Sequence, residues 1–108
     1  LLSKSNDARI LFLSSSVGRE AKAYWGAYSV SKFGIEGLAK TLAEELEKTK
    51  ISVNTLNPGK LRTEMRRTAY PAEDSSSIPL PEEKSSAVAY LVSSSSPKIN
   101  GQQFTIAD

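Results

Sequence analysis

The sequence predicts an α/β fold built on a parallel sheet, and three observations carry this prediction. A short apolar run, "RILFL" at residues 9–13, precedes a long stretch of helical periodicity at about residues 27–48. A second run, "ISVNTL" at residues 51–56, follows that stretch. Strand, helix and strand in this order form a βαβ unit, and the two strands of such a unit run parallel.

Each of these elements has its own pattern. The first run is apolar at consecutive positions, which predicts a strand buried on both faces. The helix places its apolar side chains on one broad stripe when each residue advances by about 100°. The residues of this predicted sheet-facing stripe are Ile35, Leu38, Ala39, Leu42, Ala43 and Leu46. A polar side opposite it is predicted from Glu36, Lys40, Glu44 and Glu47.

The remaining third of the chain is less regular. "NPG" at residues 57–59 ends the second strand, because proline and glycine interrupt regular structure. Residues 60–80 are rich in proline and serine, and we expect a loop that contacts substrate and is the least ordered internal segment. Residues 81–94 predict a helix in which Val88, Leu91 and Val92 share one face, and residues 102–107 predict a short last strand.

The composition excludes several classes of function. With 108 residues and 39% hydrophobic residues, one globular domain is expected. A net charge of +2 argues against a nucleic-acid or anionic-membrane partner, and no apolar run reaches the roughly 20 residues of a membrane span. The absence of cysteine and histidine removes thiol nucleophiles, Cys/His zinc sites and any Ser-His-Asp triad. A protein without cysteine is compatible with a reducing cytosol, so a cytoplasmic location is expected.

Three side chains combine into a candidate site. Tyr28 and Lys32 are four residues apart near the helix start, so they share one face and point toward the sheet. Serines 14–16 follow the first strand, at the edge where open α/β sheets bind ligands. A free tyrosine has a pKa of about 10, and a nearby ammonium lowers it. Tyrosine could then exchange a proton with an alcohol or carbonyl oxygen held by serine, while a nicotinamide supplies the hydride.

Every one of these residues also has an ordinary structural interpretation. Ser15 could cap a turn, and Lys32 could lay its stem along apolar surface with its charge in water. Tyr28 could sit at the edge of the core, which is the interpretation we assign to Tyr24 because no lysine follows it by four residues. A plain strand-ending turn is sufficient to explain Pro58 and Gly59. Thr63 could cap a short helix.

The motifs "SSSVG", "AYSVSK" and "NPG" together resemble the active-site half of the short-chain dehydrogenase/reductase family. The family's Tyr-x-x-x-Lys matches Tyr28 and Lys32, and its catalytic serine, thirteen residues earlier, selects Ser15. Its Pro-Gly matches Pro58-Gly59, and its cofactor-contacting threonine matches Thr63. Within the family, "SSSVGR", "WGAY" and "RTEMR" are similar to bacterial YciK-type oxidoreductases.

This resemblance implies a Rossmann-like, doubly wound parallel sheet and an NAD(P)-dependent oxidoreductase that interconverts an alcohol and a carbonyl. Tyr28 would be the general acid/base, Lys32 would tune it and bind the nicotinamide ribose, and Ser15 would orient the substrate. Family members pair the long helix across a homodimer or homotetramer interface, here through Val30, Gly34, Gly37 and Thr41.

The family's first half has no counterpart in these residues. The glycine-rich GxxxGxG turn that binds the pyrophosphate is absent from the sequence. Residues 1–108 are therefore expected to form the C-terminal catalytic half of the domain and to be inactive by themselves. The alternatives are a non-enzymatic dinucleotide-binding regulatory protein and an inactive oligomerising fragment.

Overall fold

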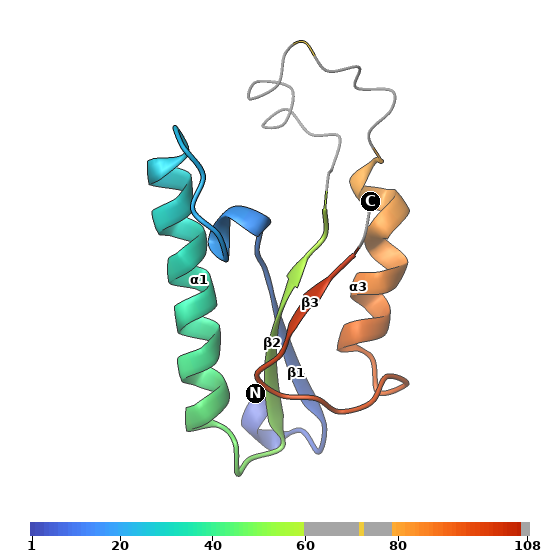
Figure 1. Ribbon diagram of the computed structural model, residues 1–108. Helices are drawn as coiled ribbons and strands as arrows, with labels where there is room; N and C mark the ends of the chain where they lie inside the picture. The colour runs from blue at the N-terminus through green and yellow to red at the C-terminus, as the bar shows by residue number, and fades with distance from the viewer. Residues whose placement is uncertain (60–71, 73–78, 107–108) are drawn as a thin grey trace.

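A three-stranded parallel sheet separates two helices in the computed structural model, which describes residues 1–59, 72 and 79–106 (Figure 1). The strands are β1 (Ala8–Leu13), β2 (Ile51–Asn57) and β3 (Gln103–Thr105), in the order β1-β2-β3. Helix α1 (Gly26–Glu45) covers one face of the sheet and α3 (Ser85–Val92) the other. Three short 3₁₀ helices complete the described elements: η1 (Leu2–Lys4), η2 (Ser16–Gly18) and η4 (Pro81–Lys84).

The predicted parallel βαβ unit is confirmed by the strand register. Ala8 pairs with Ile51 and Leu13 with Leu56, so β1 and β2 run side by side over their whole length. The third strand pairs with the carboxyl end of β2, from Thr55 opposite Gln103 onward. β3 is shorter than the predicted strand at 102–107. Because β2 is central, its inner five residues are all buried.

The first strand is less buried than its apolar sequence predicts. Among the described residues only β2 pairs with β1, which leaves β1 at the edge of the sheet. Leu13, its last residue, is 50% exposed, the residues from Arg9 to Phe12 are half-buried, and only Ala8 is fully buried. The expectation of a fully buried strand is therefore wrong for these residues: helices lie on both faces of the sheet, but one edge of β1 has no neighbouring strand among the described residues.

The sheet-facing side of α1 differs from the predicted stripe at two residues. Ala39 and Ala43 pack with Val53 of β2 in the core, as predicted, with Leu42 and Leu46 beside them. Leu38 is 50% exposed, whereas Glu36, predicted on the polar side, is only 8% exposed. The buried face thus runs through Glu36, Ala39 and Ala43, whose spacings of three and four residues place them on one side of a helix.

The segment after residue 80 also departs in detail from prediction. The expected helix at 81–94 is divided into η4 and the eight-residue α3. Val88, Leu91 and Val92 stand at spacings of three and four residues within α3, so the predicted shared face is confirmed. On that face Val88 and Leu91 are half-buried, and Val92, the last residue of α3, is 43% exposed. The predicted loop at 60–80 lies almost wholly outside the described residues, and so does its predicted lack of order.

Candidate active site

The segment that carries Ser15 begins directly after β1. Ser15 caps η2: its Oγ accepts a hydrogen bond from the Val17 backbone N–H at 3.2 Å. The capping role considered for Ser15 is thus observed in the structure. This bond uses only part of the hydrogen-bonding capacity of Ser15, because a hydroxyl that accepts one hydrogen bond can still donate its own proton to a second partner.

Tyr28 and Lys32 lie one turn apart on α1, as predicted. The Lys32 ammonium is 5.7 Å from the centroid of the Tyr28 ring. Its Nζ also donates to the backbone oxygen of Leu13 at 3.3 Å, which directs the lysine to the carboxyl end of β1. Trp25 packs edge-on against the Tyr28 ring at 5.5 Å between centroids. The shared face of the two residues is confirmed, while their catalytic role remains a prediction.

Tyr24 does not lie at the edge of the core. Its side chain is fully exposed, and its backbone is left-handed with φ of 70°. The chain enters α1 through this residue, and the left-handed turn directs the ring into solvent. A bulky residue rarely adopts this conformation, since its Cβ crowds the following carbonyl oxygen.

Gly18 brings the Ser15 segment into direct contact with α1. A Cβ at this position would lie 2.9 Å from the Lys32 Cβ and 3.0 Å from the Lys32 backbone oxygen. The same atom would lie 2.8 Å from the Ser14 hydroxyl. Ser29 adds a weak bond at 3.4 Å from its hydroxyl to the Val17 backbone oxygen. The segment that carries Ser15 and the helix turn that carries Lys32 are therefore packed backbone against backbone.

An ion pair that the sequence analysis missed lies beside this contact. Arg19 Nε donates to Glu36 Oε2 at 2.8 Å, and both side chains are largely buried. The other oxygen, Glu36 Oε1, accepts from Thr55 Oγ1 at 2.7 Å and from Gln103 Nε2 at 3.2 Å. The pair links η2, α1, β2 and β3. One signal could have revealed it: Glu36 follows Lys32 by four residues and so shares the face that was predicted to meet the sheet.

The surroundings of Glu36 hold its carboxylate in the charged form. Burial raises the pKa of Glu36, but stabilisation by Ser14, Thr55, Arg19 and Gln103 outweighs it, so the pKa lies below its ordinary value. The buried Ser14 hydroxyl has no partner at full hydrogen-bond geometry among the described residues. It nevertheless lies close enough to Glu36 to contribute to this lowering.

The Pro-Gly turn lies at the same edge of the sheet. Gly59 has φ of 76°, which favours glycine, and its N–H donates to Asn57 Oδ1 at 3.0 Å. The Pro58 backbone oxygen accepts from the Lys84 ammonium. The carboxyl ends of β1 and β2 and the start of α1 all lie at this end of the molecule (Figure 1). Thr63 lies outside the described residues.

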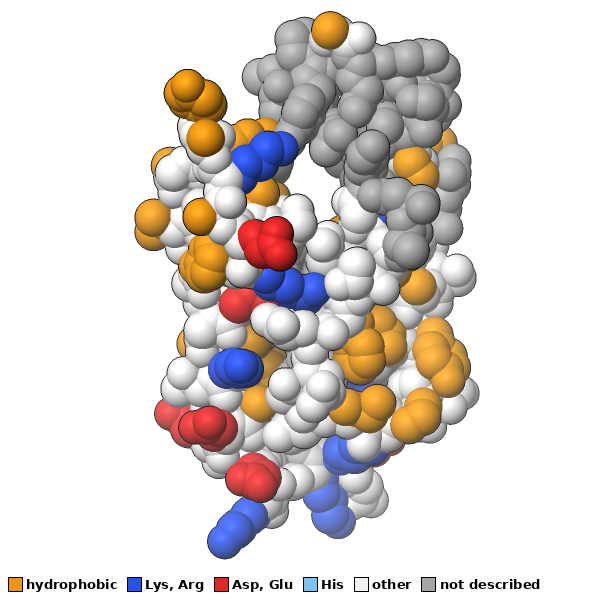
Figure 2. Space-filling view, viewed as in Figure 1, with side chains coloured by type: hydrophobic (Ala, Val, Ile, Leu, Met, Phe, Trp, Pro, Cys, Tyr) orange, Lys and Arg blue, Asp and Glu red, His pale blue; other side chains and the backbone are white. Residues whose placement is uncertain are grey.

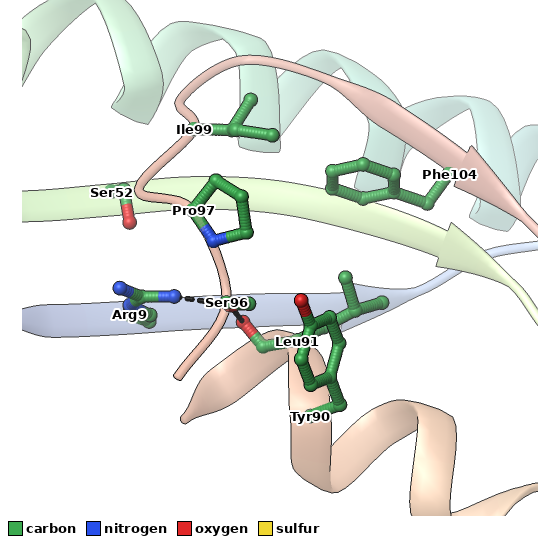
Figure 3. A pocket seen from close by; sticks show the side chains of 8 residues that line it. All are labelled: Arg9, Ser52, Tyr90, Leu91, Ser96, Pro97, Ile99 and Phe104. Atoms are coloured by element: carbon green, nitrogen blue, oxygen red, sulfur yellow. Dashed lines mark hydrogen bonds between the residues drawn. The ribbon is translucent and has the colours of Figure 1, made fainter. Parts of the chain in front are cut away.

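A pocket of about 200 Å³ lies on the opposite, α3 side of the sheet, away from these residues. Figure 3 shows Arg9 and Ser96 joined by a hydrogen bond, with Tyr90 and Phe104 among the other side chains that line the pocket. Its lining is mainly apolar and includes none of Ser15, Tyr28 and Lys32. We assign no chemistry to this pocket.

Three further properties of the described residues are charge distribution, metal-ligating groups and helix hydropathy. On the face in Figure 2, acidic and basic side chains of the described part are interspersed, with no broad area of one charge. The described residues contain no group of three acidic, histidine or cysteine side chains that could hold a metal ion. None of the described helices is long and apolar enough to cross a membrane.

Comparison with known proteins identifies the family. The chain belongs to the short chain dehydrogenases, because the sequence model of that family matches residues 1–74. It is 40% identical over 104 residues to the Escherichia coli K12 oxidoreductase YciK, covering 96% of this chain and 41% of that protein. The predicted similarity to YciK-type oxidoreductases is therefore confirmed.

Solved structures agree with this assignment. A short chain dehydrogenase from Pseudomonas syringae is 51% identical with a TM-score of 0.91, over 97% of this chain and 43% of that one. A second one, from Shigella flexneri and complexed with NADP, is 40% identical with a TM-score of 0.91. The match covers 97% of this chain and 44% of that one. The predicted Rossmann-like, doubly wound parallel fold is confirmed. The chain spans about two fifths of the length of these relatives.

Proposed function

We propose that these residues form the catalytic part of an NAD(P)-dependent oxidoreductase that interconverts an alcohol and a carbonyl. The observation that carries the proposal is the Lys32 ammonium 5.7 Å from the Tyr28 ring, on the helix against which the Ser15 segment packs. Relatives named as oxidoreductases, and a structural neighbour that binds NADP, support it. The proposal concerns a whole protein in which residues 1–108 are the C-terminal catalytic half.

The chain's own residues divide the work. Ser15 donates its proton to the substrate oxygen and orients it, and Tyr28 gives a proton to that oxygen or takes one from it. Lys32 places a positive charge beside Tyr28 and assists this exchange. When bound, the nicotinamide supplies or accepts the hydride.

The residues present fit one end of that cofactor. A hydroxyl, an ammonium and the Pro58-Gly59 turn lie at the edge of the parallel sheet where dinucleotides bind. Lys32 and Tyr28 would hold the nicotinamide ribose, with Pro58, Gly59 and Thr63 beside the ring. The six glycines of the chain form no phosphate-binding turn after a strand, so the 108 residues alone are expected to be inactive.

The outer face of α1 supports a proposal of self-association. Val30 is 75% exposed and Leu38 50% exposed. Gly34 and Gly37, on the same helix, have nothing within 4 Å of a built Cβ, so another helix could approach closely. We propose a homodimer or homotetramer formed through this face. A sedimentation mass of a single chain for the full-length protein would refute it.

Replacement of Tyr28 by phenylalanine tests the proposed chemistry. Tyr28→Phe removes the hydroxyl and keeps the ring that packs on Trp25, so the fold is retained and turnover falls at least about 100-fold. The assay follows nicotinamide absorbance in the full-length protein with NADH or NADPH and a panel of alcohols, ketones and aldehydes. Tyr24→Phe is the matched control, because the same atom is lost from a fully exposed ring. Equal turnover of Tyr28→Phe and wild type on a confirmed substrate would show that Tyr28 is not the acid/base.

A further inference from the structure

A carboxylate stands one helical turn from Lys32 and does not bind it. Glu36 follows Lys32 by four residues on α1, a spacing at which lysine and glutamate side chains commonly form ion pairs. Both residues are described, and no ion pair joins them. The Lys32 ammonium instead donates to the Leu13 backbone oxygen at 3.3 Å, beside the Tyr28 ring.

The contacts of Glu36 explain why it forms no ion pair with Lys32. Its Oε2 accepts from Arg19, and its Oε1 accepts from Thr55 and Gln103, so both oxygens are directed to the strands. Arg19 is itself fixed by three further bonds: to Thr105 Oγ1 at 2.8 Å, to Thr55 Oγ1 at 3.2 Å and to the Phe104 backbone oxygen at 3.1 Å. The guanidinium is therefore a rigid fork that holds the carboxylate on the sheet side of α1.

We infer that Arg19 is a positioning residue that acts through Glu36: it withholds this carboxylate from Lys32 and so keeps the lysine beside Tyr28. Glu36 is only 8% exposed, and a buried carboxylate without a cation is costly. Two lysines lie four residues from Glu36, Lys32 before it and Lys40 after it. Lys32 is half-buried and Lys40 is exposed, so in the absence of Arg19 we expect Lys32 to be the cation that the buried carboxylate attracts. Glu36 would then draw Lys32 from Leu13 and Tyr28. This inference rests on the proposed function of Tyr28 and Lys32.

Two single variants of the full-length protein separate this role from a merely structural one. Arg19→Gln and Glu36→Gln each leave one buried charge unpaired, so both lower stability. Only Arg19→Gln leaves a charged Glu36 beside Lys32. We expect the kcat of folded Arg19→Gln to fall at least about tenfold. We expect the kcat of Glu36→Gln, and of the double variant that combines Arg19→Gln with Glu36→Gln, to stay within about threefold of wild type. Neither protein contains the competing carboxylate.

A conservative variant keeps the test decisive if Arg19→Gln does not fold. Arg19→Lys retains a cation against Glu36 and loses the fork to Thr55 and Thr105. Its kcat is expected to stay close to that of Glu36→Gln, and a tenfold loss in folded Arg19→Lys would contradict the inference.

A crystal structure of Arg19→Gln gives a readout that does not need turnover. We expect the Lys32 ammonium within about 4 Å of a Glu36 oxygen. Equal kcat losses in folded Arg19→Gln and Glu36→Gln, or Lys32 still on Leu13 in that crystal, would overturn the inference. If instead Tyr28→Phe has wild-type turnover, the proposed function fails, and the crystal structure still decides what Arg19 does.

Discussion

A single methyl group at position 18 tests how closely the Ser15 segment packs on α1. In Gly18→Ala the new Cβ would lie 2.9 Å from the Lys32 Cβ and 3.0 Å from its backbone oxygen. Carbon atoms pack best at about 3.5–4.0 Å, so the segment and the helix must separate by about 0.5–1 Å. The Ser14 hydroxyl can rotate away, but the two Lys32 atoms belong to the helix and cannot. Overpacking of this kind costs about 1–3 kcal/mol.

Urea unfolding of the full-length protein measures this cost. Gly26→Ala is the matched control: it adds the same methyl group at the first residue of α1, where nothing lies within 4 Å. The control is expected to gain about 0.4–1 kcal/mol, because alanine restricts the unfolded chain. The two substitutions therefore shift stability in opposite directions. A Gly18→Ala variant as stable as wild type, or a gain of stability in both variants, would refute the close packing of the Ser15 segment on α1.

Two further predictions concern Tyr24 and Glu36. Tyr24→Asn is expected to raise the free energy of unfolding by about 1 kcal/mol, since asparagine tolerates the left-handed φ of 70° and the lost ring is fully exposed; a lower urea midpoint would contradict this. The folded-state pKa of Glu36 lies below the ordinary 4.5, so the unfolded state binds more protons and the carboxylate stabilises the fold above that pH. The stability difference between wild type and Glu36→Gln should therefore shrink as pH falls below 4.5, measured by urea unfolding. The pKa of Asp7 is also lowered, by its hydrogen bond with Arg9, but Asp7 is present in both proteins, so its contribution cancels in the difference. A stability difference that is constant with pH would contradict the prediction.

Local periodicity predicted the parts of this molecule that local patterns determine. The βαβ unit follows from two apolar runs around a long helix, and the shared face of Tyr28 and Lys32 follows from their spacing of four. The spacing of four from Lys32 could have indicated the burial of Glu36, but its partner could not be predicted from local periodicity, because Arg19 precedes it by 17 residues and lies beside it only in the folded chain. A glutamate with a buried partner has the same sequence pattern as one in solvent.

The backbone conformation of single residues could not be predicted from sequence patterns either. Nothing in "KAYWG" distinguishes a tyrosine in left-handed conformation from one at the core edge, since tyrosine rarely adopts such a φ. The exposure of Leu38 was missed in a similar way: hydropathy alone counts leucine as buried and glutamate as exposed, whereas here Leu38 is exposed and Glu36 is buried against Arg19.

The anchoring of Arg19 has a consequence for the order of events on the ribosome. Its guanidinium reaches Thr105 and the Phe104 backbone oxygen, 86 and 85 residues further along the chain. At about 5–20 residues per second, translation needs roughly 4–17 seconds to cover that distance. For most of this interval the nascent chain contains Ser15, Tyr28 and Lys32, but β3, whose residues hold Arg19, has not been synthesised. The contacts that hold Arg19 therefore come from a part of the chain that is made well after Ser15, Tyr28 and Lys32.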